Sequence, residues 1–208
     1  MPDETRRRVA AALEEHEPTR LQEDEKLVAR AAVTLVLRPA ETASSGDGPD
    51  AGEGLAADLL FIQRAEFDGD PWSGHMALPG GRREPQDADL RATAIRELEE
   101  ETALVLSRES ILGRLDERVP GNPALPAIGI TPYVAWFEGP DTFVPSEEVS
   151  DHVWVPLRVL FDEGHRSTLR LEHRGVTRKL PTIEYDGYTI WGITFKIVEG
   201  FLGLVAAR

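Results

Sequence analysis

Apolar positions along the chain fall into short continuous runs that predict buried strands. Residues 31–37 and 59–63 are runs of strand length, and the first is rich in Val and Leu. Residues 130–137 and 152–157 have the same character. These four runs predict the strands of a sheet.

The second half of the chain also predicts a hairpin. Residues 169–171 and 176–185 alternate partly between apolar and polar side chains. The pair Asp186-Gly187 is then a strong two-residue turn signal before residues 188–191. We expect these segments to pair as antiparallel strands.

Helical spacing marks both ends of the chain. Residues 4–16 place apolar side chains on one side and charges on the other, and Pro18 ends this helix. Residues 191–206 predict a largely apolar closing helix. Because helices are interleaved with strands of mixed direction, we predict an α/β fold in which a mixed sheet is covered by helices on both faces.

The chain is long enough for one domain. It has 208 residues and 41% hydrophobic content, which allows a sizeable core. A segment rich in Pro, Ala, Ser, Gly and Asp, residues 39–54, predicts a loop between the first two strands. We predict an N-terminal helical extension, residues 1–27, which packs on the domain or on a partner subunit, and one domain at residues 28–208.

Composition excludes several classes of function. The formal net charge of −14 argues against non-specific nucleic-acid binding and against anionic membranes. No apolar run approaches the roughly 18 residues of a membrane span, and the N-terminus leads into no signal-peptide core. The absence of cysteine removes disulfides and thiolate metal sites. We expect a soluble cytoplasmic protein that binds neither nucleic acid nor membranes.

The candidate chemistry follows the glycine pair Gly80-Gly81. Glu97, Glu100 and Glu101 are spaced i, i+3 and i+4, so they project from one face of a helix. Like charges this close repel, and oxygen-only ligands suit Mg²⁺ or Mn²⁺. The glycines free the turn from Cβ clashes, so the carbonyl of Gly81 can join the carboxylates as a ligand. An acidic, solvated helix face is the alternative interpretation.

Arg96 stands next to this acidic set. Adjacent helical residues do not face each other, so we expect Arg96 to point away from Glu97. Its expected partner is a carboxylate of the preceding loop, Asp87 or Glu84. Such an ion pair would fix the loop to the helix.

This ordered set resembles the Nudix box, the signature of hydrolases that cleave a diphosphate linked to a nucleoside and another group. Residues 96–101 match the second half of its pattern residue by residue. The loop acid is matched by Asp87, followed by eight residues rather than seven, and the late glycine is replaced by Ala103. Both departures are similar to the coenzyme A pyrophosphatase branch. The similarity covers roughly residues 28 to 205, but residues 70–76 depart from the usual coenzyme A pattern and leave the substrate open.

The resemblance implies an α/β/α sandwich and a Nudix pyrophosphohydrolase that uses Mg²⁺ or Mn²⁺. The substrate it favours is coenzyme A or a derivative, giving 4′-phosphopantetheine and adenosine 3′,5′-bisphosphate. We predict Glu97 and Glu101 as the principal metal ligands and Glu100 as a further ligand or base. Arg96 would orient helix and loop, and Glu148, in a late loop, is a second candidate for the general base.

Four residues are candidates for substrate contacts. Arg64 shares its place with the coenzyme A branch, and Trp72 can either stack on a base or anchor its loop by burial. Arg174 and Arg178 belong to the densest positive cluster of the chain, which is a candidate seat for a substrate phosphate such as the 3′-phosphate of coenzyme A. A solvated hairpin face is the alternative interpretation of that cluster.

Two other functions stay open. The first is the same chemistry on ADP-ribose, a dinucleotide or an oxidised nucleoside triphosphate. The second is a module that senses a nucleotide without cleaving it, although a retired site need not keep three repelling carboxylates. In each case the partner is a small-molecule nucleotide, and a homodimer is a reasonable expectation for the assembly.

Overall fold

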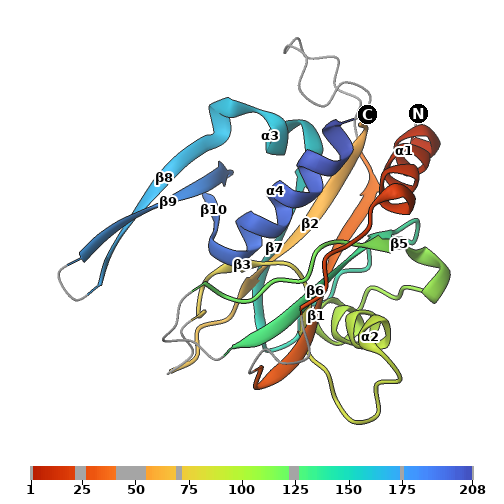
Figure 1. Ribbon diagram of the computed structural model, residues 1–208, viewed down its shortest axis with the longest axis horizontal. Helices are drawn as coiled ribbons and strands as arrows, with labels where there is room; N and C mark the ends of the chain where they lie inside the picture. Colours follow the sequence, from red (N-terminus) through yellow and green to blue (C-terminus); the bar gives the residue numbers. More distant parts are fainter. Residues whose placement is uncertain are drawn as a thin grey trace.

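A seven-stranded mixed sheet forms the centre of the molecule (Figure 1). The computed structural model describes residues 2–21, 27–40, 55–68, 72–121, 127–173 and 176–207. The strands of the central sheet are β1 (Ala29–Pro39), β2 (Ala57–Arg64), β3 (Met76–Ala77), β4 (Gly80–Arg82), β5 (Ile111–Arg114), β6 (Ile128–Trp136) and β7 (Val149–Pro156). They run in the order β3-β2-β1-β6-β5, while β4 also pairs with β1 and β7 also pairs with β2. β1 and β6 are parallel and the other pairs are antiparallel, so the predicted mixed sheet is confirmed.

β1 is buried because its side chains alternate between two apolar layers. Leu35 and Leu37 lie in one layer, whereas Ala32 and Val36 lie in the other. All four are fully buried. A strand covered on both faces accounts for the continuous apolar run in the sequence.

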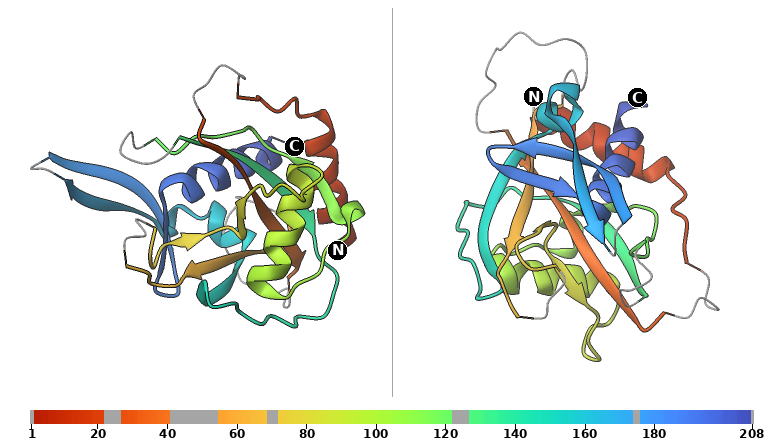
Figure 2. Two further views of the ribbon diagram at one scale, coloured as in Figure 1. Left: turned by 90° about the horizontal axis from the view of Figure 1, so that it is seen from below. Right: turned by 90° about the vertical axis from the view of Figure 1, so that its left-hand side faces the viewer.

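Helices cover both faces of this sheet (Figure 2). They are α1 (Pro2–Glu15), α2 (Leu90–Thr102), the short α3 (Leu157–Phe161) and α4 (Gly192–Ala206). α2 packs Ala94 and Leu98 into the layer of Val36, while α1 and α4 pack into the layer of Leu35. The α/β/α sandwich is therefore confirmed. Among the described helices, none is long and apolar enough to cross a membrane.

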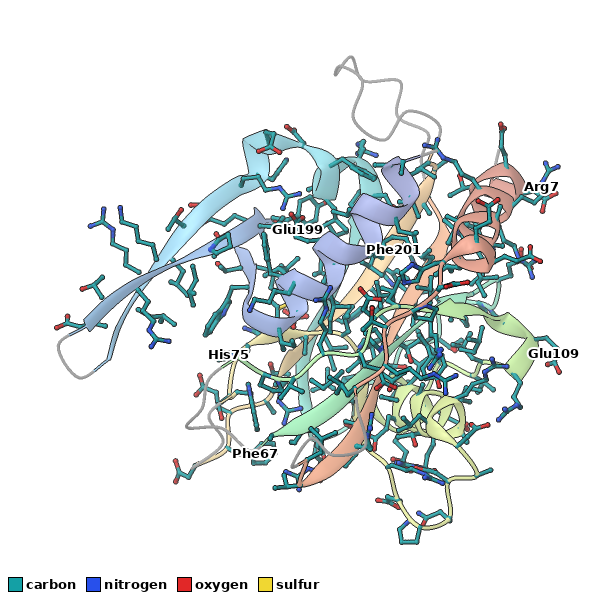
Figure 3. The ribbon with its side chains drawn as sticks, in the orientation of Figure 1. Arg7, Phe67, His75, Glu109, Glu199 and Phe201 are labelled. Carbon is teal, nitrogen blue, oxygen red and sulfur yellow. The ribbon has the colours of Figure 1, made fainter. Side chains whose placement is uncertain are left out.

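The N-terminal helix α1 packs on the domain itself. Its Val9 and Leu13 are buried in the same core cluster as Phe201 of α4, which is labelled in Figure 3. The Arg8 guanidinium also donates a hydrogen bond to the carbonyl of Val205 (3.2 Å). The predicted domain boundary after this helix stays a prediction.

A second sheet stands beside the first. Its strands are β8 (Arg166–His173), β9 (Val176–Tyr185) and β10 (Tyr188–Trp191), in the order β10-β9-β8. Asp186 and Gly187 have φ angles of 48° and 83°, so the predicted two-residue turn is confirmed. β10 pairs only with the last four residues of β9. The remaining two-stranded part, residues 168–173 and 176–181, projects from the body of the molecule and is called the arm below (Figures 1 and 2).

Short elements complete the fold. β3, β4, β5 and α3 have between two and five residues, too few to give a periodic apolar signal. Short 3-10 turns lie at Arg108–Ser110 and Glu163–His165. The predicted loop at 39–54 begins one residue later, because Pro39 still belongs to β1, and residues 41–54 lie outside the described residues.

Candidate active site

The Gly80-Gly81 turn lies in β4, and pairing with β1 decides where its peptide groups point. Ala32 lies opposite Gly81, and two residues along the ladder the Thr34 N–H donates to the Pro79 carbonyl (2.8 Å). Hydrogen-bonded pairs recur at every second residue of an antiparallel ladder. The peptide groups of Gly81 therefore face β1, and those of Gly80 face away from it.

Gly80 consequently faces α2. Its N–H donates a hydrogen bond to Oε2 of Glu101 (2.8 Å), and its carbonyl is directed to the same side of β4. The carbonyl of Gly81, the predicted metal ligand, is directed at β1 instead. The structure favours the Gly80 carbonyl as the backbone oxygen of the site.

A side chain at Gly80 would clash with backbone, and one at Gly81 would displace the Glu97 carboxylate. A Cβ on Gly80 would lie 2.2 Å from the carbonyl oxygen of Ala32, and the φ of 152° is rare for other residues. A Cβ on Gly81 would lie 2.5 Å from the carboxylate atoms of Glu97. The Glu97 carboxylate therefore occupies the space that a side chain at Gly81 would fill.

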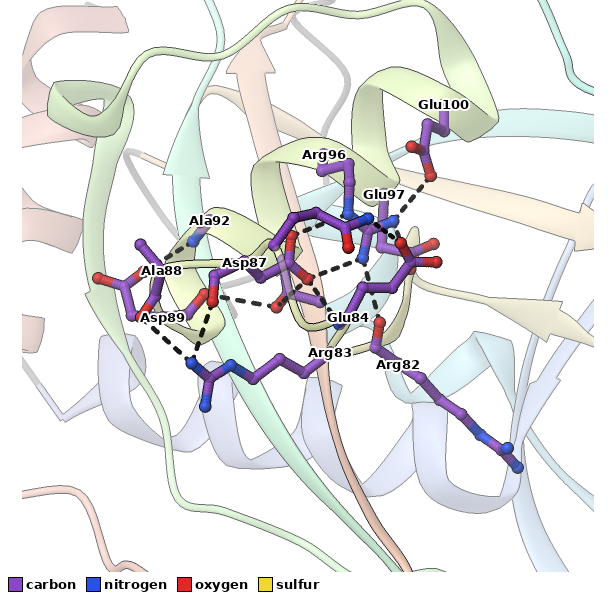
Figure 4. Close-up of polar contacts among 12 residues, drawn as sticks. Arg82, Arg83, Glu84, Asp87, Ala88, Asp89, Ala92, Arg96, Glu97 and Glu100 are labelled. Atoms are coloured by element: carbon purple, nitrogen blue, oxygen red, sulfur yellow. Dashed lines mark hydrogen bonds and ion pairs between the residues drawn. The ribbon is translucent and has the colours of Figure 1, made fainter.

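Arg96 fixes the loop to the helix, as predicted. Its Nε and Nη2 donate to the two carboxylate oxygens of Asp87 at 3.0 and 2.9 Å, and Nη2 also donates to the Arg82 carbonyl (3.1 Å; Figure 4). Of the two predicted partners the structure selects Asp87. Glu84 contacts Asp87 through its backbone, because its N–H donates to Oδ2 of Asp87 (2.9 Å) and its carbonyl accepts the Asp87 N–H (3.0 Å). Hydrogen bonding to the Arg96 guanidinium holds the pKa of Asp87 well below its ordinary value.

The expectation that Arg96 points away from Glu97 was wrong. Nη1 of Arg96 lies 2.9 Å from Oε1 of Glu97 and donates to Oε2 of Glu100 (2.8 Å). A guanidinium offers three nitrogens in a plane, so one edge holds Asp87 while the remaining nitrogen reaches the helix carboxylates. Arg96 thereby compensates part of the negative charge of the helix.

Local sequence decides where α2 begins and ends. Asp89 is the N-cap, and its Oδ1 accepts the N–H of Ala92 (2.8 Å). Ala103 is the C-cap, and its φ of 59° lies in the left-handed region that favours glycine. The residue that replaces the late glycine of the box is therefore held in a strained conformation.

Glu101 is the buried carboxylate of the site, with 4% of its surface exposed. Burial raises its pKa to about 8, and the Gly80 N–H opposes this shift. The charges of Glu97 and Glu148 raise the pKa further, while the charge of Arg64 lowers it. A carboxylate that resists ionisation in the folded protein is stabilised by a nearby cation.

The helix carboxylates do not all point to one place. Glu100 is exposed and directed at Arg96, whereas Glu97 and Glu101 lie at the glycine turn. In the part of the chain that the structure describes, no three His, Asp or Glu side chains converge in a metal-binding arrangement. The donors at the turn nevertheless fit a hard divalent cation, because two carboxylates lie there and the carbonyl of Gly80 is directed to the same side of β4. Burial also raises the pKa of Glu97.

Glu148 brings a further carboxylate to this place from the loop before β7. Its charge raises the pKa of both Glu97 and Glu101, so its field acts on both carboxyls. Its carbonyl accepts the N–H of Ala65 (2.8 Å), and its own N–H donates to Oγ of Ser146 (3.3 Å). Glu148, a predicted site residue, is thus placed where its charge acts on the carboxyls of α2.

The predicted substrate residues lie in different places. Arg64, the last residue of β2, is close enough to Glu101 to lower the pKa of that carboxyl. Trp72 is half-buried in the turn before β3. Arg178 is exposed on the arm, which Figure 1 shows on the opposite side of the molecule from α2, and Arg174 lies outside the described residues.

Two residues that position the site were not predicted, Gly80 and Ser146. Gly80 is the glycine whose peptide groups point at α2, because hydrogen bonding alternates along β4. This could not be predicted, since a three-residue strand gives no periodic signal in the sequence. A serine two residues before a glutamate is a pattern in which the hydroxyl accepts a backbone N–H, and this signal was available for Ser146.

A glycine turn followed by an acidic helix, on one face of a mixed sheet, defines the class of hydrolases that carry a Nudix box. The family model described as "NUDIX domain" matches residues 46–180. The Uncharacterized Nudix hydrolase NudL of Yersinia pestis (strain Pestoides F) is 31% identical over 143 residues, which cover 68% of this chain and 69% of the relative. The protein of the same name from Yersinia pseudotuberculosis serotype O:1b (strain IP 31758) gives the same values. This chain therefore belongs to the Nudix family.

A solved structure agrees with this fold. The crystal structure of a MutT/nudix family protein from Enterococcus faecalis matches with a TM-score of 0.57 at 21% identity. The match covers 90% of this chain and 65% of that chain. The prediction that the chain is a Nudix hydrolase is confirmed at the level of the family. The assignment to the coenzyme A pyrophosphatase branch stays a prediction.

Proposed function

We propose that this protein hydrolyses the diphosphate of a nucleoside diphosphate linked to another moiety, with Mg²⁺ or Mn²⁺ as cofactor. The observation that carries the proposal is the burial of Glu101 against Gly80, with Glu97 and Glu148 near enough for their charges to raise its pKa. Mutually repelling carboxylates in a buried place destabilise the metal-free protein, and a divalent cation offsets this repulsion. A diphosphate has the charge that such a cation attracts.

Residues at the glycine turn would hold the cation. We assign Glu97 and Glu101 as its principal ligands, with the carbonyl of Gly80 in place of Gly81. Glu100 would join them as a further ligand by leaving its pair with Arg96. When bound, a divalent cation supplies Lewis acidity at phosphate oxygens and lowers the pKa of a bound water. Arg96 acts through position, because its bonds to the loop keep the helix carboxylates against the turn.

Glu148 is the general base that we favour. Its carboxylate is exposed and its charge raises the pKa of Glu101, whereas Glu100, the other candidate, is paired with Arg96. A base needs an oxygen free to take a proton from the attacking water. Arg64, whose charge lowers the pKa of Glu101, would face the phosphate oxygens of the substrate.

For the substrate we propose coenzyme A or a derivative, cleaved to 4′-phosphopantetheine and adenosine 3′,5′-bisphosphate. Asp87 forms its bidentate pair with Arg96 despite the longer spacing, and Ala103 occupies the position of the late glycine. These are the two features that resemble the coenzyme A branch. Trp72 is proposed to stack on the adenine, while the position of Arg178 on the arm gives no support to a phosphate seat there within one chain.

A metal-dependent hydrolysis screen tests the proposal. Coenzyme A, ADP-ribose, dinucleotides and nucleoside triphosphates are each incubated with Mg²⁺ or Mn²⁺, and the products are identified by mass spectrometry. We expect coenzyme A to be cleaved and cleavage to stop on chelation. Turnover of ADP-ribose with inert coenzyme A would overturn the proposed substrate and leave the proposed hydrolase activity standing. Tight binding without any cleavage would favour the nucleotide-sensing module.

A cytoplasmic location stays a prediction.

A further inference from the structure

The arm is a two-stranded ribbon with little support from the rest of the chain. Among the described residues, the strands of the arm beyond β10 pair only with each other. Arg170, Leu171 and Glu172 of β8 are exposed, as are Arg178 and Lys179 of β9. A two-stranded ribbon in water is marginally stable on its own, so an exposed arm of this kind gains from a partner.

The two outer edges of the arm differ. The edge of β9 carries Lys179 and Pro181, residue types that discourage the addition of another strand. β8 contains neither lysine nor proline between Arg166 and His173. The edge of β8 is therefore the one that is open to pairing.

The charged residues in the outer part of β8 have no ion-pair partner among the described residues. Arg170 lies directly opposite Lys179, which is an unfavourable like-charge pair, and Glu172 lies opposite Thr177. At the base of the strand Arg166 has a carboxylate partner, Glu199 (2.7 Å). Arg170 and Glu172 form no ion pair with any residue in the described part of the chain.

We propose that β8 pairs antiparallel with β8 of a second copy of this chain, about a two-fold axis at Leu171. In this register Arg170 lies opposite Glu172 of the partner subunit, and the symmetry repeats the pair on the other side of the axis. An axis at Arg170 or at Glu172 would instead place like charges opposite each other. The sequence Arg170-Leu171-Glu172 is thus self-complementary in one register.

The same register covers exposed apolar surface. Leu171, with 36% of its surface exposed, would lie opposite its own copy at the axis. The two three-stranded sheets would join into one continuous sheet across the dimer. Each Arg170 would then have a carboxylate on one side to offset Lys179 on the other.

A cysteine cross-link tests the register. The chain contains no cysteine, so Leu171→Cys introduces a single thiol. Residues directly opposite each other in an antiparallel pair have Cα atoms about 4.5 to 5.5 Å apart, which suits a disulfide. We expect mild oxidation to give a disulfide-linked dimer of this variant in non-reducing electrophoresis. Thr168→Cys, exposed on the same strand but away from the axis, is the matched control and should stay monomeric in the gel.

Charge exchange tests the ion pairs by sedimentation equilibrium of the full chain. Arg170→Glu and Glu172→Arg should each raise the dimer dissociation constant at least about tenfold, because each places like charges opposite each other twice. The double variant should restore the dimer, and a mixture of the two single variants should form a heterodimer. Arg170→Glu also replaces the like-charge contact with Lys179 by an attractive one, so its loss of dimer cannot come from unfolding of the arm.

Several results would overturn the proposal. They are a monomer at every concentration, a dimer that the single variants leave unchanged, a double variant that fails to recover, or equal cross-linking of the Thr168→Cys control. None of these outcomes depends on the substrate or on hydrolysis.

Discussion

The backbone carbonyl of Glu101 accepts a 3.1 Å hydrogen bond from the N–H of Ser146. The next carbonyl, that of Thr102, accepts the N–H of Val144 (2.9 Å). Two carbonyls that the helix end leaves free are therefore satisfied by the loop that carries Glu148. The buried carboxylate and the candidate base are held by one set of backbone contacts.

Ser146→Ala should slow turnover through Glu148. The Ser146 hydroxyl accepts the Glu148 N–H, so its removal frees the base to move, and we expect kcat to fall roughly tenfold with KM little changed. Hydrogen exchange of the Glu148 amide should become faster. Ser146→Thr keeps the oxygen and should restore both values. Ser150→Ala is the matched control, because that hydroxyl donates to Gln63 on the neighbouring strand, and equal losses in both alanine variants would contradict the role of Ser146.

Glu101→Gln should abolish most of the activity. The substitution keeps the shape of the side chain but removes the charge that we assign to the cation, so kcat should fall at least about a hundredfold. Circular dichroism should show an unchanged fold. Glu99→Gln makes the same change at an exposed position of α2 and should retain activity. Near-normal turnover of Glu101→Gln at saturating metal would remove Glu101 from the site.

The metal-free protein should lose stability as the pH rises through the pKa of Glu101. The folded-state pKa is about 8 and the ordinary value is 4.5, so between these values the folded protein keeps a proton that the unfolded chain releases. The stabilisation is then complete below 4.5, falls between 4.5 and 8 by up to about 5 kcal/mol in total, and levels off above 8. Urea unfolding in the presence of a chelator measures this slope. Glu101→Gln should lack the slope and Mg²⁺ should reduce it; a flat profile for the parent protein would contradict the burial of a titrating carboxyl.

Arg96→Lys should destabilise the loop–helix unit. Lysine cannot make the two-pronged bond to Asp87, and it leaves a buried carboxylate with fewer donors, so we expect a loss of about 2 kcal/mol in the free energy of unfolding. Arg108→Lys changes a similar pair with Asp89 that is open to solvent and should have no measurable effect. Comparable losses of unfolding free energy in the two variants would show that burial does not account for the contribution of the Arg96–Asp87 pair to stability.

Ala103→Gly should stabilise the protein. Ala103 ends α2 at a φ of 59°, where a Cβ is unfavourable, so glycine should gain up to about 1 kcal/mol in thermal or urea unfolding. Ala92→Gly, inside the same helix, should instead lose about 1 kcal/mol. A loss at position 103 would mean that the freedom glycine gives the unfolded chain outweighs the relief of strain.

The long elements of the fold could be predicted because each carries its own periodic signal. The ends of five long elements lie within a few residues of the apolar runs that predicted them: β1, β2, β6, β7 and α4. The pairing of β4 with β1 and the division into two sheets could not be predicted, since they depend on contacts between distant segments. A three-residue strand such as β4 has no period to detect.

At the site, sequence identified the acids but not their directions. The spacing of Glu97, Glu100 and Glu101 correctly placed them on one helix, yet the geometry of β4 and the reach of Arg96 decide which of them turn to the glycines. The rule that adjacent helical residues do not face each other describes the directions of their Cβ atoms. The arginine side chain is long enough for its guanidinium to reach a neighbouring carboxylate all the same. The choice of Gly80 over Gly81 likewise follows from ladder register, which only the paired strands reveal.

The parallel pairing of β1 with β6 constrains the order in which the protein can fold. β4, α2 and β5 all lie between these strands in the chain. The long segment between β1 and β6 must therefore close into a loop before the two central strands can pair. During synthesis α2 leaves the ribosome before β6 exists, and the loop with Glu148 follows later still. The backbone contact between Ser146 and the carbonyl of Glu101 can therefore form only after the first two thirds of the chain have been made, so attachment of this loop to the end of α2 is a late event in folding.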